Sequence, residues 1–240
     1  MPEIQFKSDI DVEVIDRMGG DYMVVAAAKV SVTGLAAKQF TDGEENYGLI
    51  NYLMKHRHGT PFEHGAITFF VHAPIFVWRE WHRHRIGFSY NEESGRYKQL
   101  DPIFYLPQRD RPMMKVDGWK PGRPKFLHCD EQWKFDRLAA NLESSYRVAY
   151  ENYERNLTLG IDPGLARDCL PVGIYSGCWV TCNPRSLMAF LSLRVHHPEA
   201  KFVSYPLHEI NVAADKCEAA LKEHWPLTHR AFVENGRVGP

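Results

Sequence analysis

Hydrophobic and polar residues follow both strand and helix spacings along the chain. Ile10, Val12 and Val14 alternate with acidic residues, as in a strand with one buried face. Apolar runs predict further strands over 66–72 and 174–182. Helical spacing, together with residues that favour helix starts, predicts helices over 21–30, 44–57, 75–85, 130–159, 163–170, 184–195 and 205–225. The pattern therefore predicts an α/β (α+β) fold in which helices pack on a sheet.

Particular residues define the ends of two helices. Asp21 is expected to cap the helix over 21–30, and Gly59 to close the helix over 44–57. The helix over 130–159 has an apolar stripe, which we interpret as core or subunit interface: Leu138, Leu142, Tyr146, Ala149, Tyr153 and Leu157.

The segment 102–124 differs from the rest, with five prolines in 23 residues. This composition predicts a loop, which could be an inert insertion or a mobile lid over a site. No repeat or shift in composition forces a domain boundary. A single domain over 1–240 is therefore expected.

Composition narrows the class of protein. The chain has 240 residues, of which 44% are hydrophobic and 25% charged, so disorder is excluded. The net charge of −1 argues against a wholly basic nucleic-acid binder. No apolar run is long enough for a membrane helix, and the first residues do not resemble a signal peptide. Five Cys without CxxC spacing are expected to be buried thiols, and a cytoplasmic location fits best.

The segment Arg79–Arg85 is the most unusual part of the sequence. It carries three Arg and one Glu within seven residues and directly follows an apolar run. If the helix over 75–85 forms, Arg79 and Arg83 share one face. Arginine clusters suit phosphate because the guanidinium is always charged and donates in a planar fork. The alternative is an exposed basic turn with surface ion pairs.

A polar run at Ser89–Tyr97 adds to this signal. Ser94, Gly95 and Arg96 offer a hydroxyl, an accessible N–H and a guanidinium, which are the parts of a phosphate cradle. Asn91 and Glu92 can bond a heterocycle edge or a ribose hydroxyl. The chain lacks GxGxxG and GxxxxGK[ST], so a nucleotide site of the Rossmann or P-loop type is not expected.

Two other functions remain as alternatives. Six of the 12 His lie within 29 residues, which could indicate a metal-dependent hydrolase, although no HExxH pattern accompanies them. We expect no metal. Aromatic residues between arginines, such as Trp81, Phe88 and Tyr90, could stack the bases of a single-stranded nucleic acid.

Several segments, in order, resemble the flavin-dependent thymidylate synthases. Arg83-His84-Arg85, then eight residues, then Ser94-Gly95-Arg96-Tyr97 resembles the family signature, whose usual spacing is about seven residues. Further matches are Ala28-Lys29-Val30-Ser31, His56-Arg57-His58-Gly59-Thr60-Pro61-Phe62-Glu63-His64, Ala166-Arg167, and Asn183-Pro184-Arg185-Ser186-Leu187 followed by Arg194.

The resemblance implies a reaction, a family-specific fold and a site. The family converts dUMP to dTMP, with methylenetetrahydrofolate as carbon donor and NADPH as reductant through FAD, and it needs no Cys nucleophile. FAD would be held by Ser31, Thr60, Arg83, His84, Arg85, Glu92, Asn183 and Arg185. The residues implied for dUMP are Glu80, Arg83, Glu92, Ser94, Gly95, Arg96, Arg167 and Arg194.

The resemblance also implies roles for single residues and an assembly. Arg194 would be catalytic, holding the uracil in an ionised form, and His58 would lie near flavin and folate. The family forms homotetramers with shared active sites. Two positions depart from the family: Glu80 stands where Gln is common, and Ala189 replaces an Asn that contacts flavin.

Overall fold

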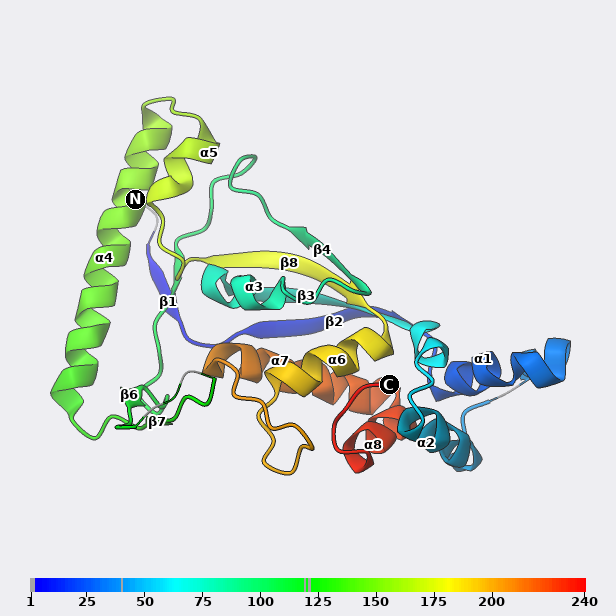
Figure 1. Ribbon diagram of the computed structural model, residues 1–240. Coiled ribbons are helices and arrows are strands. Elements are labelled where there is room, and N and C mark those ends of the chain that lie inside the picture. Colours follow the sequence, from blue (N-terminus) through cyan, green and yellow to red (C-terminus); the bar gives the residue numbers. More distant parts are fainter. Residues whose placement is uncertain (1–2, 40, 119, 121) are drawn as a thin grey trace. The chain divides into compact units, whose positions relative to one another are not determined.

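The computed structural model describes residues 3–39, 41–118, 120 and 122–240, and it confirms the predicted mixture of helices and strands (Figure 1). The strands are β1 Gln5–Lys7, β2 Asp11–Met18, β3 Ala66–Pro74, β4 Phe88–Glu92, β5 Ile103–Tyr105, β6 Met114–Lys115, β7 Phe126–Leu127 and β8 Tyr175–Cys182. The helices are α1 Asp21–Thr33, α2 Tyr47–Lys55, α3 Ile75–Trp81, α4 Gln132–Thr158, α5 Pro163–Ala166, α6 Pro184–Arg194, α7 His208–His224 and α8 Pro226–Glu234. Short 3₁₀ helices are η1 Gly34–Gln39, η2 Glu44–Asn46, η3 Thr60–Glu63 and η4 Arg167–Cys169.

The main sheet has four strands in the order β2-β3-β8-β4. The inner strand β8 is buried along most of its length, as its apolar sequence predicts. Most of the edge strand β2 is exposed in the single chain, including Val14 and Ile15, so the predicted burial of one face is not seen there. A second sheet pairs β1 with β5 in parallel, and β6 pairs with β7 antiparallel.

The chain groups into two compact units. Unit 1 contains Met1–Ile10, His72–Trp81 and Glu92–Cys178, and unit 2 contains Asp11–Val71, His82–Asn91 and Trp179–Pro240. Strands β3, β4 and β8 each contribute residues to both units. The single domain over 1–240 stays a prediction.

The core of unit 1 lies against α4. Tyr146, Tyr150 and Tyr153 of this helix are buried in one cluster with Phe104 and Ile174. Tyr146 and Tyr153, in the middle part of the predicted stripe, therefore face the core. Tyr150 was not part of the predicted stripe, and Leu138 near the start of the helix is 37% exposed.

Unit 2 corrects the predicted role of Asp21. This residue begins α1, but its buried carboxylate accepts hydrogen bonds from Leu227 N, Thr228 N and Thr228 Oγ1 at the start of α8. Asp21 therefore caps a helix about 200 residues away, and Gly20 is the N-cap of α1. Helix α8 lies entirely beyond the predicted helix over 205–225 and was not predicted, and Pro226 stands at its first position.

Two further predictions about helices were wrong. Helix α3 ends at Trp81, so Arg83 lies in the turn beyond it and does not share a helical face with Arg79. The buried Trp78 and Trp81 belong to the helix, whereas the following chain must enter β4. The left-handed residue after α2 is Arg57, with φ 62°, and not Gly59.

The segment 102–124 is more ordered than the predicted loop. It contains β5 and β6, and an isolated bridge joins Lys120 to Arg123. Two of its residues, Trp119 and Pro121, lie outside the described residues. The lid and the inert insertion both stay predictions.

Candidate active site

The first group of predicted site residues lies in unit 1, directly after β4. The carbonyl of Ser94 accepts hydrogen bonds from the N–H groups of Tyr97 (2.9 Å) and Lys98 (3.2 Å), and its Oγ accepts one from Arg96 N (3.3 Å). Ser94, Gly95 and Arg96 therefore form one tight turn, as the phosphate-cradle interpretation requires.

Arg167 lies beside this turn, although it is about 70 residues away in sequence. A Cβ on Gly95 would lie 3.1 Å from Arg167 Cδ and 3.1 Å from the side chain of Leu100. Similarly, a Cβ on Gly164 would lie 3.6 Å from Arg96 Cγ. The structure thus brings together four residues predicted for one ligand, with Gly95 permitting the close approach of Arg167.

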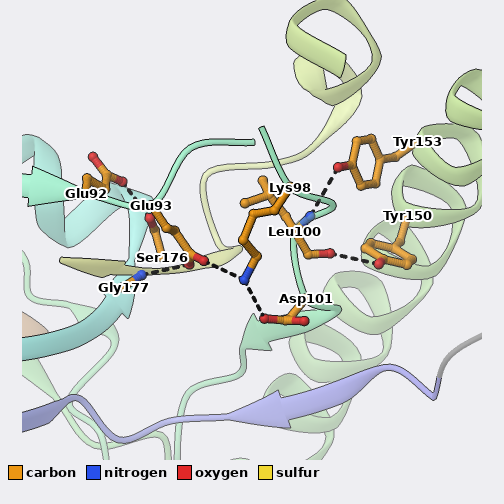
Figure 2. A network of polar contacts seen from close by, with 9 residues as sticks. All are labelled: Glu92, Glu93, Lys98, Leu100, Asp101, Tyr150, Tyr153, Ser176 and Gly177. Carbon is orange, nitrogen blue, oxygen red and sulfur yellow. Dashed lines mark hydrogen bonds and ion pairs between the residues drawn. The ribbon is translucent and has the colours of Figure 1, made fainter. Parts of the chain in front are cut away.

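Glu92 is the last residue of β4, and a hydrogen bond from a residue of β8 holds its side chain. Ser176 Oγ donates to Glu92 Oε1 at 2.7 Å, as Figure 2 shows. Glu80 lies in the same unit on α3 and is half-buried. Unit 1 therefore holds Glu80, Glu92, Ser94, Gly95, Arg96 and Arg167.

The second group lies in unit 2, around a cavity of about 510 Å³. This volume is in the usual range for small-molecule sites, about 300–1,000 Å³. The lining residues are Glu63, Ile86, Gly87, Asn183, Arg185, Ser186, Ala189, Ser192, Val238, Gly239 and Pro240. Two predicted flavin contacts, Asn183 and Arg185, are among them, and so is Ala189.

The polar groups of this cavity already have partners within the chain. Asn183 Oδ1 caps α6 by accepting from Ser186 N at 2.8 Å. Arg185 is ion-paired with Glu63 and donates from Nε to the Pro240 carbonyl at 2.9 Å. A ligand that used Arg185 would have to compete with these contacts.

Gly87 was missed by the sequence interpretation and shapes this cavity. Its φ of +69° is in the left-handed region, and a Cβ there would collide with Ser186 Oγ and lie 3.0 Å from Asn183 Nδ2. Only glycine allows the loop after Arg85 to approach the start of α6 so closely. A glycine between the basic segment Arg79–Arg85 and the polar run Ser89–Tyr97 was the available signal.

His84 and Arg194 are in direct contact in unit 2. Arg194 Nε donates to His84 Nε2 at 3.0 Å, and the His84 ring packs edge-on against Phe190. Burial, and then the positive charge of Arg194, lower the pKa of His84 to about 4. The imidazole is therefore neutral near pH 7, and its Nε2 accepts the hydrogen bond that Arg194 Nε–H donates.

The remaining predicted contacts in unit 2 are exposed and, within the described residues, do not line the cavity: Ser31, His58, Thr60, Arg83 and Arg85. Thr60 directly follows Gly59, where a Cβ would collide with the Arg185 guanidinium. Gly59 thus permits a close approach to Arg185 and does not end a helix.

The arrangement of the potential metal ligands bears on the metal-hydrolase alternative. Within the described ranges, no three His, Cys, Asp or Glu side chains are grouped so that they could hold a metal ion. The His cluster therefore gives the metal-hydrolase alternative no geometric support there. No described helix is both long and apolar enough to cross a membrane.

Comparison with known proteins gives consistent matches over the whole chain. Residues 13–227 match the family model described as "Thymidylate synthase complementing protein". The flavin-dependent thymidylate synthase of Streptomyces coelicolor is 47% identical over 241 residues, covering 100% of this chain and 97% of that protein. The enzyme of the same name from Tropheryma whipplei is 44% identical, covering 98% of this chain and 97% of that protein.

Solved structures give similar matches. The crystal structure described as a UMP/dUMP methylase, PolB from Streptomyces cacaoi, bound with 5-Br dUMP, is similar with a TM-score of 0.91 and 44% identity. The match covers 99% of this chain and 100% of the PolB chain. A structure of the same protein bound with 5-Br UMP also has a TM-score of 0.91, at 42% identity.

The fold and the matches define an enzyme of a mixed helix-and-sheet class that is distinct from the Rossmann fold. The chain belongs to the thymidylate synthase complementing protein family, whose matched relatives are named flavin-dependent thymidylate synthases. The resemblance noted in the sequence is therefore confirmed.

Proposed function

We propose that this chain methylates dUMP to dTMP, with methylenetetrahydrofolate as carbon donor and NADPH as reductant through FAD. Full-length relatives named flavin-dependent thymidylate synthase support the reaction class. The similar solved structure described as a UMP/dUMP methylase supports the substrate.

One observation carries the proposal for the nucleotide. Ser94, Gly95 and Arg96 form a tight turn, and Arg167 packs against it. The two guanidinium groups and the Ser94 hydroxyl suit the dianionic phosphate of a mononucleotide. In this proposal Glu80, Arg83 and Glu92 complete the dUMP site with Arg194.

The cavity in unit 2 fits part of the proposed FAD. Arg185 and Asn183 line it, and Gly87 keeps its wall open, because a Cβ there would collide with Ser186 Oγ. We assign FAD binding to these two residues with Ser31, Thr60, Arg83, His84, Arg85 and Glu92, and we assign His58 to the vicinity of flavin and folate. When bound, FAD supplies the hydride chemistry that the side chains lack.

Arg194 is the proposed catalytic residue. The neutral His84 accepts its Nε–H, which fixes the plane of the guanidinium. A guanidinium has five donors, so it can bond His84 and also face a pyrimidine oxygen. Donors aimed at developing negative charge stabilise the transition state, and this is the role proposed for Arg194 on the uracil.

The cysteines support a mechanism without a thiolate nucleophile. Cys178, Cys182 and Cys217 are buried, and burial raises the pKa of the Cys182 and Cys217 thiols well above the ordinary value. The exposed Cys169 also has a raised pKa because of desolvation. Nucleophilic cysteines need the opposite shift.

We also propose a single domain that assembles as a homotetramer with shared sites. Val32 and Ile86 are 87% and 91% exposed in the single chain, and each directly follows a proposed flavin contact. Burying them against another copy would remove apolar surface from water beside the site. Light scattering coupled to size exclusion measures the assembly, and a monomeric flavin-loaded protein would contradict it.

The test of the reaction is tritium release from dUMP labelled at carbon 5. Release is expected with methylenetetrahydrofolate, NADPH and FAD, and it should be lost when methylenetetrahydrofolate or NADPH is omitted or when the flavin has been removed from the protein. The purified protein should have a flavin absorption band that NADPH bleaches. A colourless protein that takes up no FAD on titration would overturn the proposal.

UMP is a second candidate substrate, because the similar solved protein is described as a UMP/dUMP methylase and was also solved with 5-Br UMP. The same assay with labelled UMP gives the ratio of kcat/KM for the two nucleotides. This ratio decides between a deoxyribonucleotide enzyme and one of broader range.

A further inference from the structure

The loop 93–101 carries the proposed phosphate-binding turn, and it is fixed at both ends by residues to which no role has been assigned. We infer that Tyr150 and Tyr153 of α4, together with Glu93, are positioning residues that hold this loop in the shape that binds the nucleotide phosphate. The inference rests on the proposed function of Ser94, Gly95 and Arg96.

Glu93 fixes the first end of the loop to β8. Its N–H donates to the Gly177 carbonyl at 2.9 Å, and its Oε1 accepts from Gly177 N at 2.8 Å. Both backbone groups of Gly177 are thus bonded to one residue, which directly precedes Ser94. Figure 2 shows the bond from Gly177 N to the Glu93 side chain. Glu93 Oε2 also pairs with Lys98 Nζ at 2.9 Å, and Lys98 pairs with Asp101 at 3.1 Å.

The two tyrosines fix the other end. Leu100 N donates to Tyr153 Oη at 3.1 Å, and Tyr150 Oη donates to the Leu100 carbonyl at 2.8 Å. Residues three apart on a helix share a face, so both hydroxyls point toward the loop, as Figure 2 shows. Gln99 Nε2 adds a bond to Tyr150 Oη at 3.2 Å.

Leu100 connects the hydrogen bonds of Tyr150 and Tyr153 to the phosphate-binding turn. Its side chain packs below Gly95, within 3.1 Å of where a Cβ would lie, and Arg167 packs against the same glycine. A shift of Leu100 would therefore move Gly95 and change the spacing between the turn and Arg167. Sites held to the required precision need this kind of support behind the contacting groups.

Packing alone does not explain why Tyr150 and Tyr153 carry hydroxyl groups. Tyr150 is 2% exposed and Tyr153 is fully buried, and a buried hydroxyl is unfavourable unless it is hydrogen-bonded. Phenylalanine would fill the same space without that cost. Burial raises the pKa of Tyr150, so its hydroxyl stays protonated and able to donate to Leu100.

The test compares flavin-loaded wild type with Tyr150→Phe, Tyr153→Phe and the double variant. We expect the Kd and KM for dUMP to rise about tenfold in the double variant, with kcat and FAD affinity nearly unchanged. Deoxyuridine, which lacks the phosphate, should bind wild type and variants equally. A merely structural role would weaken both ligands or lower kcat.

Tyr146→Phe is the matched control. It makes the same change on the same helix and in the same buried cluster, and among the described residues no hydrogen bond joins its hydroxyl to the loop. Its dUMP affinity should equal that of wild type. Lys98→Met tests the end of the loop that Glu93 holds. The Lys98 side chain is half-exposed, so folding is preserved, and a two- to threefold loss of affinity for dUMP alone is expected.

The outcomes separate the two proposals. If wild type binds dUMP no better than deoxyuridine, the phosphate role of the turn fails. If wild type prefers dUMP but the double variant and Lys98→Met keep full affinity, the positioning role is overturned. A double variant that does not fold leaves Lys98→Met to decide, and unchanged dUMP binding there counts against the inference.

Discussion

The phosphate-binding turn of unit 1 and the cavity of unit 2 are built in opposite ways. Arg96 and Arg167 lie at a turn whose shape is set by hydrogen bonds behind it, from Glu93 and from the tyrosines of α4. Arg185 in the cavity is instead bonded to Glu63 and to the Pro240 carbonyl.

This difference has a thermodynamic consequence. A ligand at the turn meets a preformed shape and loses little affinity to rearrangement. A ligand at Arg185 must replace bonds that the chain already makes. We therefore expect tight binding of the nucleotide at the turn without rearrangement of the chain. Flavin binding should depend on how firmly Glu63 and the Pro240 carbonyl hold Arg185.

The largest expected effect is at the residue proposed to act on the reacting ring. Arg194→Ala should lower kcat by about 1,000-fold, because a donor facing developing charge is lost. The variant should retain its flavin absorption band. Tritium release and the flavin spectrum are measured together, and normal turnover would remove Arg194 from the mechanism.

A pair of arginine variants tests whether the two regions bind different ligands. Arg96→Ala should weaken dUMP by about 50-fold and leave FAD affinity unchanged, whereas Arg185→Ala should weaken FAD by a similar factor. Fluorescence titration of FAD and calorimetry with dUMP supply the two constants. If each variant weakened both ligands equally, the division into two sites would be wrong.

Gly87→Ala tests the close approach that shapes the cavity. Forcing a Cβ into a left-handed conformation and within 3.1 Å of Ser186 Cβ should cost roughly 3 kcal/mol of unfolding free energy. Gly160→Ala is the control, since its φ is +76° but a Cβ there meets nothing within 4 Å. It should cost only about 1 kcal/mol, and equal losses in urea unfolding would exclude a special role for Gly87.

The stability of the protein is also expected to depend on pH through His84. The pKa of His84 is about 4 in the folded state against 6.5 ordinarily, so between these values the unfolded chain binds more protons. The contribution of His84 is complete above pH 6.5 and is lost as the pH falls toward 4. His84→Gln should therefore show a shallower loss of stability in this window than wild type. The exposed His64→Gln is the control, and a wild-type slope in His84→Gln would contradict the assignment.

The sequence interpretation was most accurate where the signal is local. Apolar spacing located α4, α6 and the buried strand β8, because each buries a face whose periodicity is set by its own backbone geometry. The ordered motifs also identified the family, because they preserve residue types at fixed positions along the chain.

The interpretation was wrong where a distant partner decides the local structure. Helical spacing continues to Arg85, yet the helix ends at Trp81 because the next residues turn at Gly87 into β4. Asp21 looks like a cap for its own helix, but its carboxylate serves α8. Gly59 looks like a helix end, but it gives space to Arg185.

The sequence by itself therefore determined the fold class, the family and the types of side chain that the site contains. Which groups contact each other was decided only by the tertiary structure: Arg167 against Gly95, Arg194 on His84, and Tyr150 and Tyr153 on the backbone of Leu100. The physical reason is that hydrogen bonds and close packing act over a few ångströms in space, between residues tens to more than a hundred positions apart in the chain.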